Sequence, residues 1–376
     1  MAQDTLHWQQ REAMVLARRR TAAIVDLAAL RANYRQLAEL SGAAHGAPVV
    51  KGGGYGLGMV AVSKATAAEG ARMFLVARRE DGEDLRAALP DPEILILDGL
   101  GGHDPGDFEV HSLTPVLGDL ADIKRWFAKP RRVPAFVHFD TGMSRLGLRP
   151  EEAGIAAVIL KAAPAGSIAG YLTHFLKADD ADLSRCSGQV TAFRRAIAGL
   201  PKARTSIVNS AGLFLDEKRD WRESFTRLGK ALYGIHTGPR DKPNPVKPVL
   251  SVYAPILQVR DVAAGETVGY GATFTAQVPM RVATLGIGYT NGYLRSLSNK
   301  GVVAFGGVRA PLVGRVSMDL LTVDVTLVPE LALASGVAEI LGPNIGLTEL
   351  SALAGSNEHE MQITLGSGCH RVYVGG

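Results

Sequence analysis

Two patterns of hydrophobic and polar positions divide the chain near residue 245. From about residue 22 to 240, short apolar and β-branched runs alternate with segments of helical periodicity. After the run AIVDL, for example, Leu30, Tyr34, Leu37 and Leu40 recur every three or four residues. Beyond residue 245, prolines cluster, the helical periodicity fades and short β-like runs follow one another. The chain is therefore predicted to form an α/β domain and then a mostly β domain.

The first region contains eight strand candidates from the run APVVK onward. Strands that alternate with helices pair in parallel, and eight of them favour a TIM-type (β/α)8 barrel over an open sheet. The candidates are APVVK, MFLVAR, EILIL, LTPVL, PAFVHFD, AGYLTHF, RTSIVNS and KALYG. The later β-like runs are VLSVYAPILQV, MRVATLGIG, VVAFGG and LLTVDVT. We predict an N-terminal extension at residues 1–20, a barrel at 21–244 and a β domain at 245–376.

Composition narrows the class of protein. The chain has 376 residues, 47% hydrophobic and 21% charged, which is enough for an ordinary core in two units. The net charge is only +4, and the basic runs ARRR and KPRRV lack interleaved aromatic residues, so we expect no nucleic-acid partner. Cys186 and Cys369 form no C-x-x-C pair, which indicates a reducing compartment and no metal site. The charged N-terminus and the lack of a long apolar run predict a soluble, cytoplasmic protein with no membrane segment.

Polar residues stand at the ends of four predicted strands and lead into a fifth, KALYG, and a parallel barrel has its active site at the carboxyl ends of its strands. Singly, each has an ordinary structural explanation, because a lone histidine more often belongs to a core and a loop arginine to an ion pair. Their shared position favours a functional site. These residues are Lys51, Asp140 with Arg145, His174, Asn209 with Ser210, and Arg227 with Gly229.

Lys51 closes the first strand and is followed at once by glycines, in PVVKGGGYGLG. Two interpretations compete: a phosphate cradle in which the lysine is only a charge, or a site where its amine reacts. Since the lysine precedes the glycines, neither G-x-G-x-x-G nor a phosphate loop ending in G-K-S/T is present. A lysine partly withdrawn from water has a lowered pKa. Its free amine can condense with an aldehyde such as that of pyridoxal 5′-phosphate (PLP), which glycines would let the backbone approach.

The segment VVKGGGYGLG resembles the PLP-lysine motif of alanine racemases. The segments DTGMSRLGL, YLTHF, NSAGLF, RLGKALYG, GETVGYGATFTA, LGIGYTNGY and VGRVSMDLLTVDV follow in the family's order. The resemblance spans about residues 19–376. It implies an isomerase with a PLP-binding (β/α)8 barrel and a C-terminal β domain. It also implies a homodimer with shared active sites that interconverts L- and D-alanine.

The resemblance further implies a role for each matching residue. Lys51 and the partner subunit's Tyr270 would be the catalytic bases on opposite faces of the substrate's Cα. The groups around the cofactor would be Tyr55 and Ser210 on the phosphate with the backbone of Gly229 and Lys230, His174 against the pyridine ring, and Arg227 on the pyridine nitrogen. The groups around the substrate would be Arg145 and Met318 near its carboxylate and the opposing tyrosine, with Tyr289 and Asp319 at the entrance.

These roles form a consistent chemical scheme. Racemisation removes a proton from one face and returns one to the other, so two bases are needed. A phenol with a pKa of about 10 needs cationic neighbours, and Arg145 and His174 are the candidates. Arg227 keeps its proton, so the pyridine nitrogen stays unprotonated and less negative charge enters the ring. An arginine at this position favours racemisation over decarboxylation or transamination.

Two departures from the family affect the catalytic groups. Gly52 and Gly53 stand where members have KADAYG or KANAYG, so we expect a looser loop, less pre-organisation of Lys51 and slower turnover. His138 stands where many members carry a carbamate-modified lysine that steadies the arginine. Arg145 must therefore be held otherwise, by an anion or by His138 itself.

Two other departures affect the phosphate end. Lys230 replaces a usual isoleucine; its backbone would still serve the phosphate, and its amine would add charge. Cys369 stands in place of a phosphate-binding tyrosine, and Tyr373 follows four residues later. Either position would have to supply that contact.

Other functions stay open at this point. One is racemisation of another small amino acid such as serine, since one methylene changes a binding energy by only about 1–3 kcal/mol. Biosynthetic and catabolic roles are equally compatible with the motifs. A PLP carrier protein without turnover would resemble the barrel alone, whereas this chain has the second domain and Tyr270. A related decarboxylase would carry a cysteine where GRVSMD has Ser317.

Overall fold

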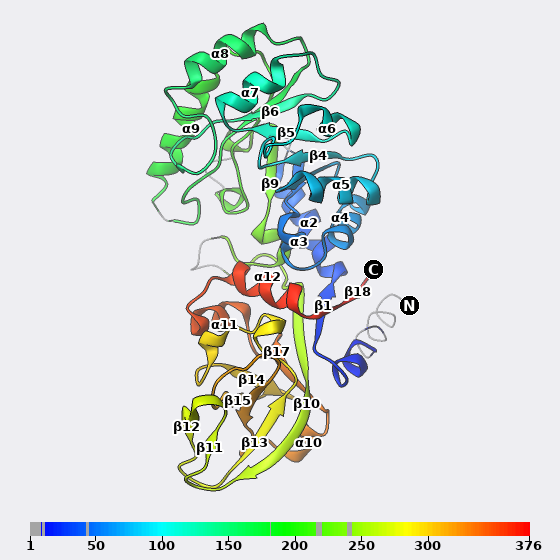
Figure 1. Cartoon of the computed structure of the whole chain (residues 1–376), viewed down its shortest axis with the longest axis vertical. Coiled ribbons are helices and arrows are strands. Elements are labelled where there is room, and N and C mark those ends of the chain that lie inside the picture. Colours follow the sequence, from blue (N-terminus) through cyan, green and yellow to red (C-terminus); the bar gives the residue numbers. More distant parts are fainter. Residues whose placement is uncertain (1–8, 10–11, 43–44, 181, 216–219, 239–242) are drawn as a thin grey trace. The chain divides into compact units, whose positions relative to one another are not determined.

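The computed structural model describes residues 9, 12–42, 45–180, 182–215, 220–238 and 243–376, which form two compact units. One, the barrel unit, contains the described residues of Leu30–Gly54 and Met59–Lys247. The other, the C-terminal unit, contains those of Met1–Ala29, Tyr55–Gly58 and Pro248–Gly376. Figure 1 shows the elements of both. The domain boundaries predicted after residues 20 and 244 stay predictions.

Eight parallel strands form the core of the barrel unit. Six pair in sequence order: β3 (Met73–Val76), β4 (Glu93–Ile96), β5 (Thr114–Leu117), β6 (Ala135–His138), β7 (Ile168–Leu172) and β8 (Arg204–Ser206). The other two, β2 (His45–Pro48) and β9 (Phe225–Leu228), pair with each other. Parallel bridges from Val49 to Leu75 and from Asn209 to Arg227 join the two groups. The ring of strands therefore closes, and the predicted (β/α)8 barrel is confirmed.

The eighth strand begins earlier than the sequence pattern indicated. The run KALYG was expected to be a strand, but Lys230–Tyr233 form a 3-10 helix, η3, and the strand is β9. This part of the prediction is wrong because an apolar run between glycines can be buried as one helical turn as well as in a pleat. Gly234, with φ 84°, ends the turn, and the buried Arg227 inside β9 concealed the strand.

Helices follow the strands and cover the barrel (Figure 1). They are α2 (Leu27–Ser41), α4 (Met59–Ala68), α5 (Arg79–Ala88), α6 (Pro105–Val110), α7 (Leu120–Phe127), α8 (Ala153–Ala162) and α9 (Ser184–Ile197). In α2, the periodic residues Leu30, Tyr34 and Leu37 are buried, as their spacing predicted. Asp119 begins α7 by accepting a hydrogen bond from the Asp122 N–H at 2.8 Å, a typical N-cap.

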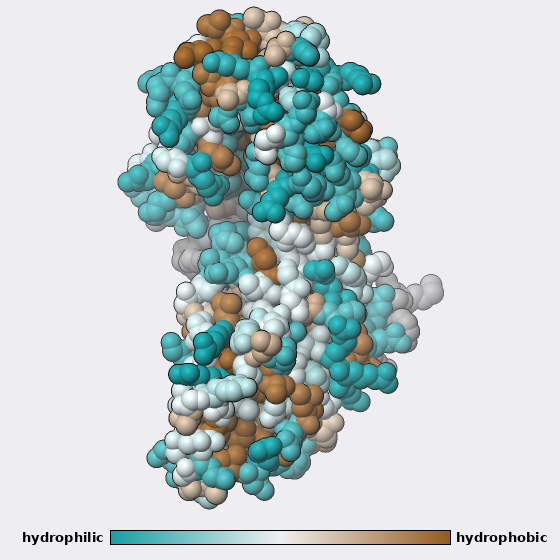
Figure 2. Space-filling view, viewed as in Figure 1, coloured by the Kyte–Doolittle hydropathy of each residue, from teal (hydrophilic) through white to brown (hydrophobic). Residues whose placement is uncertain are grey.

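Helix α8 is apolar on both of its faces. It buries Ala156 and Leu160 but exposes Ile155 and Val158. Figure 2 shows hydrophobic residues gathered on the surface over this helix. Its sequence therefore predicted a helix correctly but did not distinguish its buried face.

The long strand β10 (Leu250–Val262) organises the sheet of the C-terminal unit. Its first half pairs antiparallel with β1 (Ala22–Asp26) and β17 (Val337–Leu341), and its second half with β13 (Met280–Leu285). The other strands of the sheet are β14 (Val302–Phe305), β15 (Val308–Pro311), β16 (Leu321–Asp324) and β18 (His370–Val374). The predicted mostly β region is confirmed, although α10 (Glu330–Leu333), α11 (Leu347–Ala354) and α12 (Glu358–Gly368) were not anticipated.

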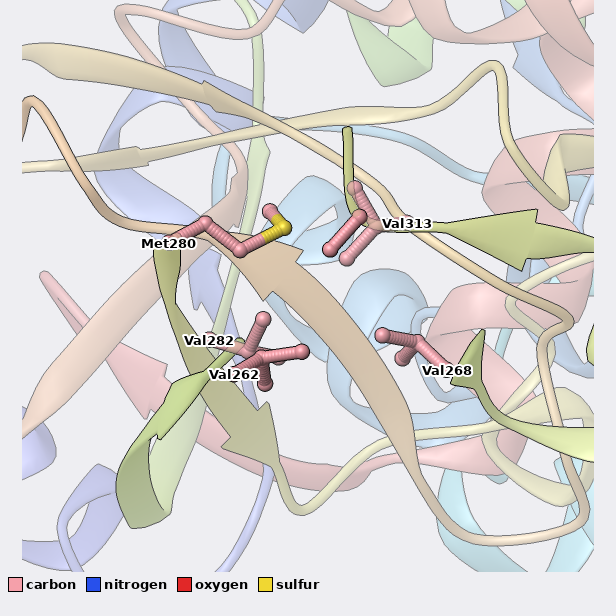
Figure 3. Close-up of a cluster of buried hydrophobic side chains, with 6 residues drawn as sticks. Val262, Val268, Met280, Val282 and Val313 are labelled. Carbon is pink, nitrogen blue, oxygen red and sulfur yellow. The ribbon is translucent and has the colours of Figure 1, made fainter. Parts of the chain in front are cut away.

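A small hairpin, β11 (Thr267–Val268) with β12 (Phe274–Thr275), is attached to this sheet by a hydrophobic cluster. The cluster contains Val262, Val268, Ala276, Met280, Val282 and Val313, with Phe274 packed against it (Figure 3). Two residues per strand are too few to hold a hairpin together in water. Burial of Val268 and Phe274 at its base therefore fixes it. No helix among the described residues is long and apolar enough to cross a membrane.

Candidate active site

Lys51 lies just beyond β2, at the carboxyl end of the barrel strands. Two neighbouring strands hold the residues before it: the Val49 N–H donates to the Leu228 carbonyl at 2.9 Å, and the Val50 N–H to the Leu75 carbonyl at 2.8 Å. The backbone that delivers the amine is thus fixed from both sides, as the strand-end argument predicted.

The environment of Lys51 favours the uncharged amine. Burial lowers its pKa, and the positive charge of Arg145 lowers it further, whereas Asp98 opposes both. A lower pKa leaves more of the amine free to act as a nucleophile or a base. Sequence analysis missed Asp98, although it comes directly after the strand EILIL and the same strand-end argument applies to it.

The glycines after Lys51 adopt a conformation that other residues avoid. Gly52, Gly53 and Gly54 have φ of 62°, 63° and 67°, and Tyr55 continues with φ 53°. An L-residue in this left-handed region pays about 1–2 kcal/mol, which glycine does not. The glycine run thus removes strain at three of these four positions.

Arg227 is the most enclosed charge in the barrel unit's site. Its guanidinium donates to the Ser206 carbonyl at 3.0 Å, the Ser206 hydroxyl at 2.6 Å and the Ile207 carbonyl at 3.1 Å, and also to the Thr173 carbonyl. Burial lowers its pKa to about 10, so it stays charged at neutral pH. No carboxylate pairs with it among the described residues. Neutral oxygens therefore hold a fixed positive charge here.

His174 lies beside this guanidinium, with its Nδ1 at 3.3 Å from Arg227 Nη2. Burial lowers the pKa of His174 well below its ordinary value, and the charge of Arg227 lowers it further. Burial and Arg227 likewise lower the pKa of His138 to about 4. Both imidazoles are neutral at neutral pH. The prediction that His174 supplies positive charge is therefore wrong, and Arg145 is the remaining candidate.

The loop that carries Arg145 is organised by the carboxylate of Asp140. Asp140 accepts hydrogen bonds from the backbone N–H groups of Gly142, Met143 and Ser144 at 2.9 to 3.2 Å. The Arg145 side chain is exposed and has no hydrogen bond or ion pair with any described residue. It lines a cavity of about 500 Å³ together with His138 and Asp98. The backbone of the loop is fixed, and the guanidinium faces open space.

Ser210 joins the ends of two neighbouring strands. Its hydroxyl oxygen accepts from the Gly229 N–H at 2.8 Å and the Ala231 N–H at 3.4 Å. Its own proton has no acceptor among the described residues, and neither has the N–H of Lys230. These two donors and the half-buried Lys230 side chain suit an anion.

The C-terminal unit carries Tyr270 at the tip of the β11–β12 hairpin, where 74% of the side chain is exposed. Gly269 and Gly271, on either side, have φ of 75° and 73° and allow the tight turn. A Cβ on Gly271 would lie 3.1 Å from Nη1 of Arg315. The base of the hairpin is buried and its tip is presented to solvent.

Tyr289, Met318 and Asp319 lie on two adjacent loops of the same unit. The Tyr289 N–H donates to the Ser317 carbonyl at 3.1 Å, and the Thr290 hydroxyl donates to Asp319 Oδ1 at 2.6 Å. The side chains of Tyr289 and Met318 are exposed. The structure thus places these three residues on neighbouring loops, and their roles at the substrate stay predictions.

The two candidates for a C-terminal phosphate contact also belong to this unit. Cys369 is buried, and its thiol donates to the Asn291 carbonyl at 3.4 Å. Burial raises its pKa to about 12, so it stays protonated. The Tyr373 hydroxyl lies against Gly58, three residues beyond Tyr55. Tyr373 thus contacts the Tyr55–Gly58 segment through its side chain.

The predicted site residues thus fall into two groups. The barrel unit contains Lys51, Arg145, His174, Ser210, Arg227, Gly229 and Lys230, and the C-terminal unit contains Tyr55, Tyr270, Tyr289, Met318 and Asp319. In the described residues, no group of three or more His, Cys, Asp and Glu side chains could hold a metal ion. The chemistry of the barrel group is that of an amine with a lowered pKa, a fixed cation in Arg227 and anion-binding donors.

Comparison with known proteins agrees with this arrangement. A family described as "Alanine racemase, N-terminal domain" matches residues 25–237, and one described as "Alanine racemase, C-terminal domain" matches residues 249–373. The chain belongs to the alanine racemase family. The resemblance drawn from the motifs is confirmed, and so is the prediction of an isomerase at the level of the family.

Several alanine racemases are similar over nearly their full length. The alanine racemase of Methylobacterium sp. (strain 4-46) is 39% identical, over 93% of this chain and 96% of its own length. A catabolic alanine racemase of Agrobacterium fabrum is 38% identical, over 93% and 91%. The crystal structure of the Bartonella henselae alanine racemase, with covalently bound pyridoxal phosphate, has a TM-score of 0.87 and 34% identity, over 94% of this chain and 99% of that one.

Proposed function

We propose that the protein is a PLP-dependent racemase that interconverts L- and D-alanine by means of two bases, Lys51 and the partner subunit's Tyr270. The observation that carries the proposal is the half-buried Lys51 amine, whose pKa is lowered at the carboxyl end of a closed barrel. The alanine racemase relatives support the choice of reaction. The solved relative with covalently bound pyridoxal phosphate supports the cofactor.

The residues of the barrel unit fit PLP. Lys51 would hold its aldehyde end, Arg227 would donate to its pyridine nitrogen, and Ser210 with the Lys230 N–H would hold its phosphate. When bound, PLP withdraws electrons from the Cα of an attached amino acid and makes its proton removable. Arg227 already has neutral partners for most of its donors, so its charge is fixed in place. It would donate a hydrogen bond without giving up its proton.

The two bases would act on opposite faces of Cα. Lys51 would move a proton on one face as the uncharged amine. The partner subunit's Tyr270 would move one on the other face, and Arg145 is the cation that would lower the cost of its phenolate. Met318 would help place this tyrosine, while Tyr289 and Asp319 would line the entrance. His174, neutral, would pack against the ring of the cofactor.

A homodimer is part of this proposal. Tyr270, Tyr289 and Met318 are exposed large side chains of the C-terminal unit, and the hairpin under Tyr270 is anchored by the hydrophobic cluster of Figure 3. A rigid hairpin with an exposed aromatic tip is suited to enter the site of a second copy. The expected assembly is a cytoplasmic homodimer with shared sites, and the substrate is a small amino acid.

Borohydride reduction of the protein with PLP tests the proposal. Mass spectrometry should find the reduced cofactor on Lys51, and a cofactor found on Lys64 or Lys230 instead would refute the assignment. Exchange of Cα hydrogen for deuterium in D₂O, screened over the common amino acids, should be fastest with alanine. Faster exchange with serine would indicate the alternative substrate, and cofactor binding without any exchange would indicate a carrier.

A further inference from the structure

The four residues Tyr55–Gly58 pack with the C-terminal unit, although their neighbours in sequence on both sides belong to the barrel unit. Helix α12 and strand β18 provide the contacts. A Cβ on Gly56 would lie 2.7 Å from the Ile363 carbonyl oxygen and 2.8 Å from its Cα. A Cβ on Gly366 would lie 2.7 Å from the Gly56 carbonyl oxygen. The loop backbone therefore lies directly on the backbone of α12.

Arg371, in β18, ties these two backbones together. Its Nη1 donates to the Gly56 carbonyl at 3.0 Å and to the Gly366 carbonyl at 3.3 Å. The close approach of the two glycines brings both carbonyl dipoles to one place, and the guanidinium compensates them. Arg371 makes no ion pair with a carboxylate in the part of the chain that the structure describes. Its hydrogen bonds go to backbone.

The residue before Gly56 needs such support. Tyr55 is not a glycine, yet its φ is 53°. A conformation of this kind costs of order 1–3 kcal/mol and persists only where the surroundings enforce it. Arg371 holds the carbonyl of the next residue and so restricts the backbone that aims the Tyr55 phenol. Burial raises the pKa of that phenol to about 12, so it is a hydrogen-bond donor at neutral pH.

We propose that Arg371 is a positioning residue for the phosphate end of the cofactor, acting through the Gly56 carbonyl on Tyr55. This inference rests on the proposed function and on the role that the family resemblance implies for Tyr55, which is to hold the phosphate. The Tyr373 hydroxyl, which lies against Gly58, supports the same segment. The thiol of Cys369 is engaged with the Asn291 carbonyl instead.

Binding of PLP and of pyridoxal, which lacks the phosphate, separates positioning from general stability. The dissociation constants of both are measured on the cofactor-free protein and expressed as a ratio. Arg371→Met should reduce the preference for PLP about tenfold, the factor that a charge-assisted hydrogen bond typically contributes. Arg371→Lys should reduce it less, because an ammonium can still donate to the Gly56 carbonyl. Arg309→Met is the control, because Arg309 is an exposed arginine of the same unit that pairs with Glu349. It should leave the ratio unchanged.

A double variant tests the route through Tyr55. Tyr55→Phe should reduce the preference for PLP, and adding Arg371→Met should reduce it little further. Equal weakening of PLP and pyridoxal in Arg371→Met, or a full additional loss in the double variant, would overturn the proposal. If Arg371→Met does not fold, as shown by the loss of its cooperative thermal transition, Arg371→Lys takes its place. An unchanged ratio of the PLP and pyridoxal dissociation constants in Arg371→Lys would then contradict the proposal. Borohydride fixation on Lys51 with an unchanged ratio would refute only the role of Arg371, whereas failure of fixation in the unaltered protein would refute the proposed function.

Discussion

The two proposed bases stand in opposite environments. Lys51 follows a barrel strand, is half-buried, and is surrounded by groups that shift its pKa. Tyr270 stands at a hairpin tip with 74% of its side chain exposed, and no described residue forms a hydrogen bond with its hydroxyl. Residues of the same chain tune Lys51. Tyr270 is held by a rigid hairpin, but its side chain faces solvent.

This difference explains how a chain can carry a reactive group without completing a site. A phenol in water is a weak base, since its pKa is about 10. Placed against a second copy's Arg145, it would gain the cation that it lacks in solvent. Variants of the barrel side should therefore affect cofactor binding as well as turnover, whereas variants of the hairpin should affect turnover alone.

Lys51→Ala should have the largest effect, because it removes both the attachment of the cofactor and one base. We expect racemisation to fall by at least about 10⁴-fold and no cofactor to be fixed by borohydride. The matched control is Lys64→Ala, which replaces an exposed lysine of α4 and should keep both racemisation and borohydride fixation of the cofactor. Chiral chromatography of alanine measures the first quantity and mass spectrometry the second. Substantial racemase activity in Lys51→Ala would contradict both roles proposed for Lys51, the attachment of the cofactor and the first base.

Tyr270→Phe should affect turnover and spare the barrel side. Racemisation should fall by about 10²–10³-fold, while PLP binding and thermal stability stay unchanged because the side chain is exposed. Exchange of Cα hydrogen in D₂O should be lost for one enantiomer of alanine and persist for the other, since Lys51 still serves one face. Equal small losses for both enantiomers would show that Tyr270 is not the second base.

Mixed dimers test whether the two environments meet across subunits. Chains with Lys51→Ala and chains with Tyr270→Phe are each expected to be nearly inactive alone. Combined, they should regain activity because one of the two sites in a mixed dimer would be intact. Absence of recovery, in mixtures shown by mass spectrometry to contain heterodimers, would place the tyrosine in its own chain's site.

The barrel and the position of its site could be predicted from sequence because both follow from local rules. Alternating strands and helices give parallel pairing, and residues after parallel strands share one edge. Lys51, His174 and Ser210 were found in this way, whereas Arg227 was found because it leads into the run KALYG. The eighth strand was misplaced because the apolar turn Lys230–Tyr233 resembled a strand more closely than β9 with its arginine did.

What could not be predicted depends on contacts between distant segments. The neutral state of His174 results from burial and from Arg227, fifty-three residues later. The packing of Tyr55–Gly58 against α12 and Arg371 joins positions more than three hundred residues apart, without a motif to mark it. Local pattern placed the reactive groups, and only the folded chain shows what tunes and supports them.

Substitution of Arg227 tests how much this buried guanidinium contributes to the stability of the protein. Arg227→Met would leave the carbonyls of Thr173 and Ile207 without a donor among the described residues, while the Ser206 carbonyl would keep the Thr173 N–H. We expect the free energy of unfolding of the cofactor-free protein to fall by about 3 kcal/mol, measured by chemical denaturation. Arg227→Lys, which keeps a charge and some donors, should lose less. Equal stability of all three proteins would mean that this guanidinium is not structural.

The pH dependence of stability gives a smaller effect with a definite sign. The pKa of His138 is lowered to about 4 in the folded protein, so at intermediate pH the unfolded chain binds a proton that the folded one does not. Stability is therefore complete above the ordinary histidine pKa of about 6.5 and is lost as the pH falls from there towards 4. Between pH 6.5 and 5 the loss should reach about 2 kcal/mol, and His138→Gln should remove that part of the slope. His370→Gln, at an exposed histidine, should keep the slope of the unaltered protein.

Substitution of a single glycine after Lys51 should have the smallest effect. It tests whether these glycines relieve backbone strain in a left-handed turn or only make the loop looser. Gly53 has φ 63°, and a Cβ there would meet no atom within 4 Å, so Gly53→Ala changes backbone preference without a clash. It should destabilise the protein by about 1 kcal/mol, and Gly53→Asn by less, because asparagine tolerates the left-handed region. Gly154→Ala, in the right-handed α8 and equally free of contacts, should have the opposite sign and stabilise by about 0.5–1 kcal/mol. If Gly53→Ala were instead stabilising and raised turnover, the run would be a loose segment, as the sequence comparison suggested, and the left-handed turn would not be the reason for its glycines.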